Sequence, residues 1–569
     1  MAKLSEGGWE RAQRRRRWRR RLPLLGVGLL ALGAGIVVGS RVGGGEGAVV
    51  SEYVRAWAHG DYRRMYALLD GRSRGRLDEA HFADAYARDA RTTTLVRLVP
   101  LRVGGLHDNV IHVSMLAETT VFGRMREQLI VPLAQTSSGP AVRFAQTLLF
   151  PGLRPGERLS RRAVLPPRAA ILARDGTPLA EGPDRSSPIP AVASEIAGVL
   201  EPIPAAQATA YAALGYPPDA RVGHDGLERV FQRQLAGTPG GTLLAGHRIL
   251  AHVSPIPGRA VTTTIDPAVE AAAIQALGGR FGGIAAMDPR TGAIRALAGL
   301  AFSVVQPPGS TMKIITATAA LQAGIVKLSS TFPYATSSTI DGYTLQNANG
   351  ESCGGTLLNA FAVSCNSVFA PLGARLGAAR LVSMAERFGF NHPVPIAGAA
   401  ESQIPSAQTI GDSLAVGSSA IGQGKVQASA LEMTDVAATI AMGGRRPLPT
   451  LLAGQPPRFV DVTTPQVAGL VERMMIAVVQ FGTGTGAQIP GVRVAGKTGT
   501  AELVNTAPQG NQSNPNAGSP KNTDAWFVGY APVGAPRIVA GALFPNQGAG
   551  GGTAAPAVQS VLLAGLHAH

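Results

Sequence analysis

The sequence predicts a membrane-anchored protein built from several α+β domains. Three observations support this fold class: the length of 569 residues, a basic segment followed by an apolar one near the start, and separate helical and strand-like runs after them. The apolar fraction of 45% is sufficient for large cores. We expect a tail, a membrane span, a linker and three domains, at residues 1–21, 22–39, 40–47, 48–152, 153–262 and 263–569.

The first 39 residues have the pattern of a signal anchor. Residues 1–21 carry Lys3 and eight arginines against two glutamates, and residues 22–39 carry no charge. Eighteen uncharged residues are near the lower limit for a membrane span, and basic residues before the span predict a cytoplasmic N-terminus and an external remainder. A cleaved signal peptide is the alternative, but the span exceeds the roughly 7–15 apolar residues of that class. The basic run is therefore assigned to the membrane and not to nucleic acid.

Residues 48–152 show two helical patterns and then alternating, strand-like patterns. The helices are expected at Val50–Leu69 and Glu79–Arg88. The strands are expected at Leu95–Val103, Asn109–Ala117, Arg126–Leu133 and Ala141–Phe150. This order predicts a small α+β domain with a curved sheet. No titratable cluster stands out in it, which favours a spacer or binding role.

Residues 153–262 are rich in proline and glycine, with short strands and one helical stretch at Asp225–Leu235, and predict an elongated, β-rich linking module. The pattern changes after residue 262. A helix is expected at Pro267–Leu277, and strands at Ile284–Met287 and Ile294–Ala298.

Ser310 and Lys313 form an S-x-x-K pair at the start of an apolar, alanine-rich helix. The preceding Pro-Pro-Gly turn cannot be helical, so Ser310 is expected at the helix N-cap. Spacing i, i+3 places both side chains on one face. The chain has only six lysines, and a lysine in an apolar helix suggests an amine that must lose its proton, which arginine cannot do. The alternative is a capped helix with a solvated lysine.

Two further clusters have residue types that suit chemistry. Ser364 and Asn366 lie between helical segments expected at Leu357–Val363 and Ser367–Leu376, where they can face a cleft or simply cap a helix. Lys497-Thr498-Gly499-Thr500 follows the strand-like Val492–Val494. Its glycine would let a substrate backbone lie against a strand edge, and the alternative is a hairpin turn.

The remaining motifs predict less. Cys353 and Cys365 are close in sequence and external, so a disulfide between them is expected, although two unpaired cysteines remain the alternative. Residues 411–414 resemble a lipase serine motif without its strand-turn-helix context. Residues 482–486, Gly-Thr-Gly-Thr-Gly, lack the βαβ pattern of a dinucleotide site. The ten histidines show no metal-ligand spacing, and no metal or cofactor is expected.

The order S-x-x-K, S-x-N, K-T-G is the signature of penicillin-binding proteins and class A β-lactamases. The chain resembles the class B penicillin-binding proteins, which are membrane-anchored peptidoglycan D,D-transpeptidases. Residues 167–180, 226–240, 422–424 and 525–530 are similar to other blocks of that family. The resemblance implies an NTF2-like domain at 48–152, a dimerisation or linking module, and a transpeptidase domain in which helices flank an antiparallel sheet beside an all-helical part.

The resemblance also implies roles for the site residues. Ser310 would be the nucleophile, Lys313 its base and Ser364 a proton relay, while Asn366, Lys497, Thr498, Gly499 and Thr500 would bind the substrate. The ligands would be peptidoglycan stem peptides and β-lactams, and the expected membrane partner is a SEDS-type glycosyltransferase. A D,D-carboxypeptidase, a β-lactamase and a β-lactam sensor use the same chemistry and remain alternatives.

Overall fold

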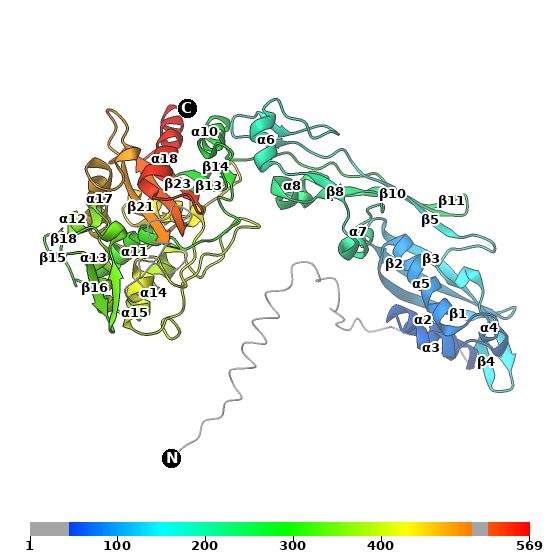
Figure 1. Cartoon of the computed structure of the whole chain (residues 1–569). Coiled ribbons are helices and arrows are strands. Elements are labelled where there is room, and N and C mark those ends of the chain that lie inside the picture. The colour runs from blue at the N-terminus through cyan, green and yellow to red at the C-terminus, as the bar shows by residue number, and fades with distance from the viewer. Residues whose placement is uncertain (1–44, 503–521, 569) are drawn as a thin grey trace, which may run out of the picture. The chain divides into compact units, whose positions relative to one another are not determined.

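The computed structural model describes residues 45–502 and 522–568. The predicted basic tail, the apolar span and most of the linker lie outside these ranges. Among the helices of the described residues, none combines the length and apolarity needed to cross a membrane. The chain divides into two compact units, one made of residues up to Arg161 together with Thr242–His252, the other of Arg162–Gly241 and Val253–His569 (Figure 1).

In the first unit, short helices precede an antiparallel sheet of order β1-β2-β3-β4. The elements are α2 (Gly45–Ala58), α3 (Tyr62–Ala67), α4 (Gly71–Arg74), α5 (Glu79–Thr93), β1 (Leu95–His107), β2 (Val110–Thr119), β3 (Gly123–Thr136), β4 (Gly139–Val142) and η1 (Gln146–Leu148). The expected strand Ala141–Phe150 is wrong after Val142, because the chain turns into η1 there. Tyr86 in α5 donates a hydrogen bond to the η1 carbonyl of Leu148 at 3.0 Å.

The linking region of the second unit consists of short elements. They are β5 (Leu159–Val164), β6 (Ile171–Leu172), β7 (Pro178–Ala180), α6 (Pro190–Ile196), β8 (Leu200–Pro202), η2 (Ala205–Gln207), α7 (Ala208–Ala213), β9 (Arg221–Gly223), α8 (Gly226–Val230), α9 (Gln232–Ala236), β10 (Gly240–Ala245), β11 (Arg248–Val253) and β12 (Val261–Thr262). The unit boundary passes through β5, β10 and β11. The expected helix Asp225–Leu235 is interrupted between α8 and α9. Fully buried Glu228 accepts hydrogen bonds from Arg168 and Arg185, both at 2.6 Å, which satisfies its charge.

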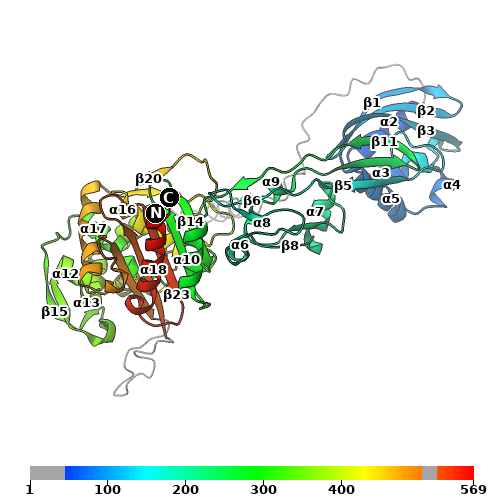
Figure 2. The same cartoon turned by 90° about the horizontal axis from the view of Figure 1, so that it is seen from above.

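The C-terminal part of the second unit contains a five-stranded sheet of order β14-β13-β23-β22-β21. Its elements are α10 (Pro267–Leu277), β13 (Gly283–Asp288), β14 (Ala293–Gly299), β21 (Ala495–Glu502), β22 (Thr523–Ala531), β23 (Ile538–Phe544) and α18 (Gly550–His567). Helices α10 and α18 pack together on one face of the sheet (Figure 2). The Phe527 side chain enters the core on that face. The preceding residue, Trp526, enters the opposite core, because neighbouring strand side chains point to opposite faces.

That opposite core is mainly helical. It includes η3 (Gly309–Met312), α11 (Lys313–Gln322), α12 (Leu357–Ala362), α13 (Asn366–Leu376), α14 (Ala378–Phe388), α15 (Ser413–Ala420), α16 (Ala430–Ala441) and α17 (Pro465–Gln480), whereas η5 (Thr485–Ala487) packs against α18 in the other core. Small ladders join β15 (Thr331–Ala335) to β18 (Cys353–Thr356), β16 (Ser337–Ile340) to β17 (Tyr343–Gln346), and β19 (Arg445–Pro447) to β20 (Phe459–Asp461); η4 (Ala348–Gly350) precedes β18. Helix α11 is buried from Lys313 to Leu321, all but its last residue, and so lies at the centre of this core.

Candidate active site

Ser310 lies in the 3₁₀ turn η3, which runs directly into α11. The expected N-cap position is therefore wrong: Lys313 is the first α-helical residue, and the residue before it is itself in a helical conformation. The turn forms because Gly309 has a φ of +52°, which glycine adopts without strain. A Cβ on Gly309 would also come within 3.0 Å of the Thr500 backbone. This close approach places Ser310 beside the K-T-G strand.

Lys313 is fully buried beneath Ser310. Its Nζ donates hydrogen bonds to the Ser364 carbonyl and to Asn366 Oδ1, both at 2.7 Å, and lies 3.3 Å from Ser364 Oγ. None of these bonds reaches Ser310, and hydrogen bonds of catalytic groups often tighten only when substrate binds. The structure therefore brings the S-x-x-K lysine and the S-x-N pair into direct contact.

Ser364 connects the two lysines of the site. Its Oγ accepts a hydrogen bond from Lys497 Nζ at 2.8 Å and lies 3.3 Å from Lys313 Nζ. Ser364 has a φ of +64°, a left-handed conformation that non-glycine residues rarely adopt. Such strain persists only where surrounding structure holds the backbone, and it often marks functional positions.

The electrostatic environment favours neutral amines. Burial lowers the pKa of Lys313 well below its ordinary value, and the neighbouring Lys497 lowers it further. Burial lowers the pKa of Lys497 to about 7. Within residues 45–502 and 522–568, the hydrogen-bond acceptors of both lysines are hydroxyl, carbonyl and amide oxygens, with no carboxylate among them. The lowered pKa favours the neutral amine, which is the form of Lys313 that can act as a base.

The K-T-G motif forms the edge strand β21 itself and does not follow a strand, which corrects the sequence-based prediction. Gly499 has a packing role that the sequence did not indicate. A Cβ there would lie 2.8 Å from the Pro308 carbonyl and 3.1 Å from Thr311 Cγ2, so this glycine allows η3 to pack on the strand. Thr498 is 5% exposed, and the partly buried Thr500 accepts a hydrogen bond from Gly550 N–H at 3.4 Å.

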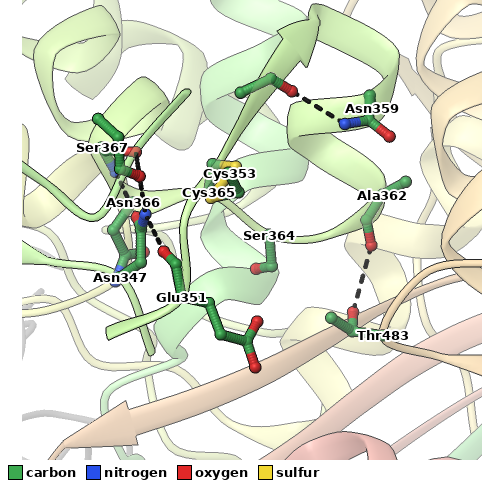
Figure 3. Close-up of a disulfide and its surroundings, with 12 residues drawn as sticks. Asn347, Glu351, Cys353, Asn359, Ala362, Ser364, Cys365, Asn366, Ser367 and Thr483 are labelled. Atoms are coloured by element: carbon green, nitrogen blue, oxygen red, sulfur yellow. Dashed lines mark hydrogen bonds between the residues drawn. A yellow bond between two sulfur atoms is a disulfide. The ribbon is translucent and has the colours of Figure 1, made fainter. Parts of the chain in front are cut away.

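Cys353 and Cys365 are joined by a disulfide bond, as the sequence suggested (Figure 3). Cys365 lies between Ser364 and Asn366, so the bond fastens their loop to β18.

Asn347 is a site residue that the sequence did not reveal. Its Oδ1 accepts the Ser367 N–H at 2.8 Å, and its Nδ2 donates to the Glu351 carbonyl at 2.8 Å. A lone asparagine in a loop has no sequence pattern that indicates this role.

The lipase-like residues 411–414 have an ordinary structural explanation. Asp412 caps α15 by accepting the Ala415 N–H at 2.9 Å, and Ser413 is the first residue of that helix. By contrast, Gly422 lies at the site, although the sequence indicated it only as part of the family-like block at residues 422–424. Its carbonyl accepts the Gly309 N–H at 3.0 Å, and a Cβ would come within 2.0 Å of the Gly309 oxygen.

Comparison with known protein families gives two matches. Residues 282–563 match the penicillin-binding protein transpeptidase domain, and residues 176–253 match the penicillin-binding protein dimerisation domain. The Mycolicibacterium smegmatis D,D-transpeptidase PbpA is 32% identical over 434 residues, which cover 63% of this chain and 82% of that protein. The Mycobacterium tuberculosis PbpA is 35% identical over 47% of this chain, and the chain spans 56% of that relative's length.

Solved structures show the same fold. The crystal structure of PBPA from M. tuberculosis has 26% identity and a TM-score of 0.55, over 71% of this chain and 100% of that chain. The imipenem acyl-enzyme complex of penicillin-binding protein A from M. tuberculosis has 26% identity and a TM-score of 0.57, over 71% of this chain and 99% of that chain.

Proposed function

The chain belongs to the class B penicillin-binding proteins, and from this premise we propose that it is a peptidoglycan D,D-transpeptidase acting through an acyl-enzyme on Ser310. The observation that supports the proposal most is the connection of Lys497 through Ser364 to Lys313. Two buried amines with no carboxylate partner in the described part of the chain destabilise a fold. Their retention beside a nucleophile is explained by chemistry that needs a neutral lysine.

Acylation begins at the peptide bond between the two terminal D-alanines of a stem peptide. Ser310 Oγ attacks the carbonyl carbon, and its proton passes to neutral Lys313. As the tetrahedral intermediate collapses, the C–N bond breaks and the leaving D-alanine amine takes a proton from Lys313, relayed by Ser364. The products are free D-alanine and an ester between Ser310 and the remaining peptide.

Deacylation reverses the proton transfers. The amine of a neighbouring stem peptide attacks the ester carbonyl and gives its proton to Lys313. The C–O bond then breaks, and Ser310 regains its hydroxyl proton. An amide cross-link between two stem peptides is the product. A β-lactam would acylate Ser310 in the same way, since it mimics the D-Ala-D-Ala end.

The other site residues bind the substrate and stabilise the tetrahedral intermediate. The backbone N–H groups of Ser310 and Thr500 would donate to the oxyanion, each contributing on the order of 3 kcal/mol. Lys497, Thr498 and Thr500 would hold the terminal carboxylate, and Asn366 the substrate amide. Gly499 would contribute by letting η3 approach β21, which sets the distance between the nucleophile and these groups.

We infer the cellular arrangement from the sequence patterns. Residues 22–39 would anchor the protein in the cell membrane by a single span, with residues 1–21 cytoplasmic and the transpeptidase domain outside. Residues 48–152 would form an NTF2-like domain and residues 153–262 a linking module that carries the transpeptidase domain, residues 263–569, towards its substrate. A SEDS-type glycosyltransferase would supply the glycan strands.

Mass spectrometry tests the acyl-enzyme. The purified protein is incubated with a labelled penicillin, digested and mapped, and the adduct is expected on the peptide that contains Ser310. An adduct on Ser364 or Ser413 would overturn the assignment, and Ser310→Ala is the negative control. A second assay supplies a pentapeptide donor and an acceptor amine. Cross-linked product supports transpeptidation, whereas tetrapeptide alone would indicate a carboxypeptidase.

A further inference from the structure

We propose that Thr483 is a positioning residue that orients the Thr498 hydroxyl towards the substrate carboxylate. Thr483 belongs to the Gly-Thr-Gly-Thr-Gly segment, residues 482–486, which has no role in the mechanism described above. The inference rests on the proposed function, because it assumes that Thr498 binds the terminal carboxylate. It adds a residue from outside the three signature motifs to that binding site.

The loop between α17 and η5 brings Thr483 between two parts of the site. Thr483 N–H donates to the Ala362 carbonyl at 3.1 Å, at the end of α12 and two residues before Ser364. Figure 3 marks the longer contact, 3.5 Å, between the Thr483 hydroxyl and the same carbonyl. Gly482 permits this approach, because a Cβ there would lie 2.2 Å from the same carbonyl oxygen. On its other side, Thr483 Oγ1 forms a short hydrogen bond with Thr498 Oγ1. One residue therefore contacts both the Ser364 loop and the K-T-G strand.

The available donors and acceptors decide the direction of the hydroxyl bond. A threonine hydroxyl has one proton to donate and two lone pairs that accept. The Ala362 carbonyl already accepts the Thr483 N–H and lies 3.5 Å from Thr483 Oγ1, at the outer limit for a hydrogen bond. The Thr483 proton is therefore best used by donating to Thr498 Oγ1.

This direction leaves the Thr498 proton free. When Thr498 accepts from Thr483, its own O–H must point elsewhere, and a carboxylate in the cleft is an acceptor without protons. A hydroxyl that receives one hydrogen bond is polarised and donates a stronger second one. Thr483 would thus strengthen recognition of an anionic end group without touching it. A ligand that lacks the carboxylate would not benefit.

The test compares benzylpenicillin with its methyl ester, which lacks the carboxylate. The second-order acylation rate is measured for the wild type, Thr483→Val and Thr483→Ser. Thr485→Val is the matched control, because Thr485 lies in the same exposed segment and has no assigned role. We expect Thr483→Val to slow acylation by benzylpenicillin about tenfold and acylation by the ester less than about twofold, since only the charge-assisted hydrogen bond is weakened. Thr483→Ser should stay within about twofold of the wild type.

Three outcomes would overturn the inference. Thr483→Val could slow both compounds equally, which would indicate a purely structural role. Thr483→Val could leave the acylation rates of both compounds unchanged. Thr483→Ser could also be acylated by benzylpenicillin as slowly as Thr483→Val. Failure of the wild type to react with benzylpenicillin is a different result, because it would overturn the proposed function and the inference together.

Discussion

Replacing Lys313 with arginine separates a base from a fixed positive charge. Lys313 Nζ donates to the Ser364 carbonyl and to Asn366 Oδ1, two oxygens that can only accept. A neutral amine has two N–H groups for these acceptors and keeps its lone pair for the proton of Ser310. Arginine does not deprotonate in proteins, so Lys313→Arg retains a cation but removes the base.

The expected loss is large. With an ordinary pKa, roughly one lysine in 3,000 would be neutral at pH 7, so the lowered pKa of Lys313 multiplies the active fraction many times. General base catalysis contributes about 10²- to 10⁴-fold, or ~3–5 kcal/mol of barrier. We therefore expect acylation by penicillin to fall by at least about a hundredfold.

Stopped-flow measurement of the second-order penicillin acylation rate checks this prediction. Thermal melts of each variant establish that it is folded, and Lys327→Arg, at an exposed lysine, controls for the substitution itself. A folded Lys313→Arg protein that acylates within about tenfold of the wild type would refute the general-base role. In that case the lysine would act only as a charge.

Three further predictions concern the disulfide, the acyl-enzyme and pH. Cys353→Ser should lower the free energy of unfolding by about 3 kcal/mol in urea titrations, because the bond joins residues 12 positions apart and so restricts the unfolded chain. Two alkylatable thiols in unfolded, unreduced protein would contradict the bond. The penicilloyl adduct should persist far longer than in a β-lactamase when excess fluorescent penicillin is removed, since a transpeptidase must exclude water, and rapid repeated turnover would assign the protein to the lactamases. Burial raises the pKa of Glu270 to about 8. Between about pH 4.5 and 8 the folded state therefore binds more protons than the unfolded state, and the free energy of unfolding falls by about 5 kcal/mol at most as the pH rises through this range. Glu270→Gln should reduce this pH-dependent decrease in the free energy of unfolding, measured by urea titration. An unchanged pH dependence would contradict the raised pKa of Glu270.

The sequence predicted regular elements well where periodicity was strong. Helix α10 has the predicted bounds, Pro267–Leu277, and β13 and β14 contain the two predicted strands. Glycine-rich segments were harder. Glycine has a low strand propensity, so the sequence predicts the K-T-G segment after a strand and not within one. Packing against neighbours overrides that propensity: a Cβ on Gly496 would meet Phe527, and a Cβ on Gly499 would meet Pro308.

The site could be predicted as a set of residues but not as an arrangement. The motif order indicated Ser310, Lys313 and Lys497, because their chemistry requires these residue types. The shared contact with Ser364 depends on a left-handed backbone at a serine, which no local pattern indicates. Asn347 and Thr483 reach the site from distant segments, so their contacts exist only in the folded chain.

The single hydroxyl between two amines has a consequence for how binding and reactivity are coupled. A carboxylate that binds beside Lys497, as proposed above, favours the protonated form of that lysine. A positive Lys497 in turn lowers the pKa of Lys313 and keeps the base neutral. The two lysines then titrate as a pair, and their apparent pKa values belong to the pair. Arrival of the correct peptide end would itself prepare the nucleophile, so an empty site would be less reactive than an occupied one.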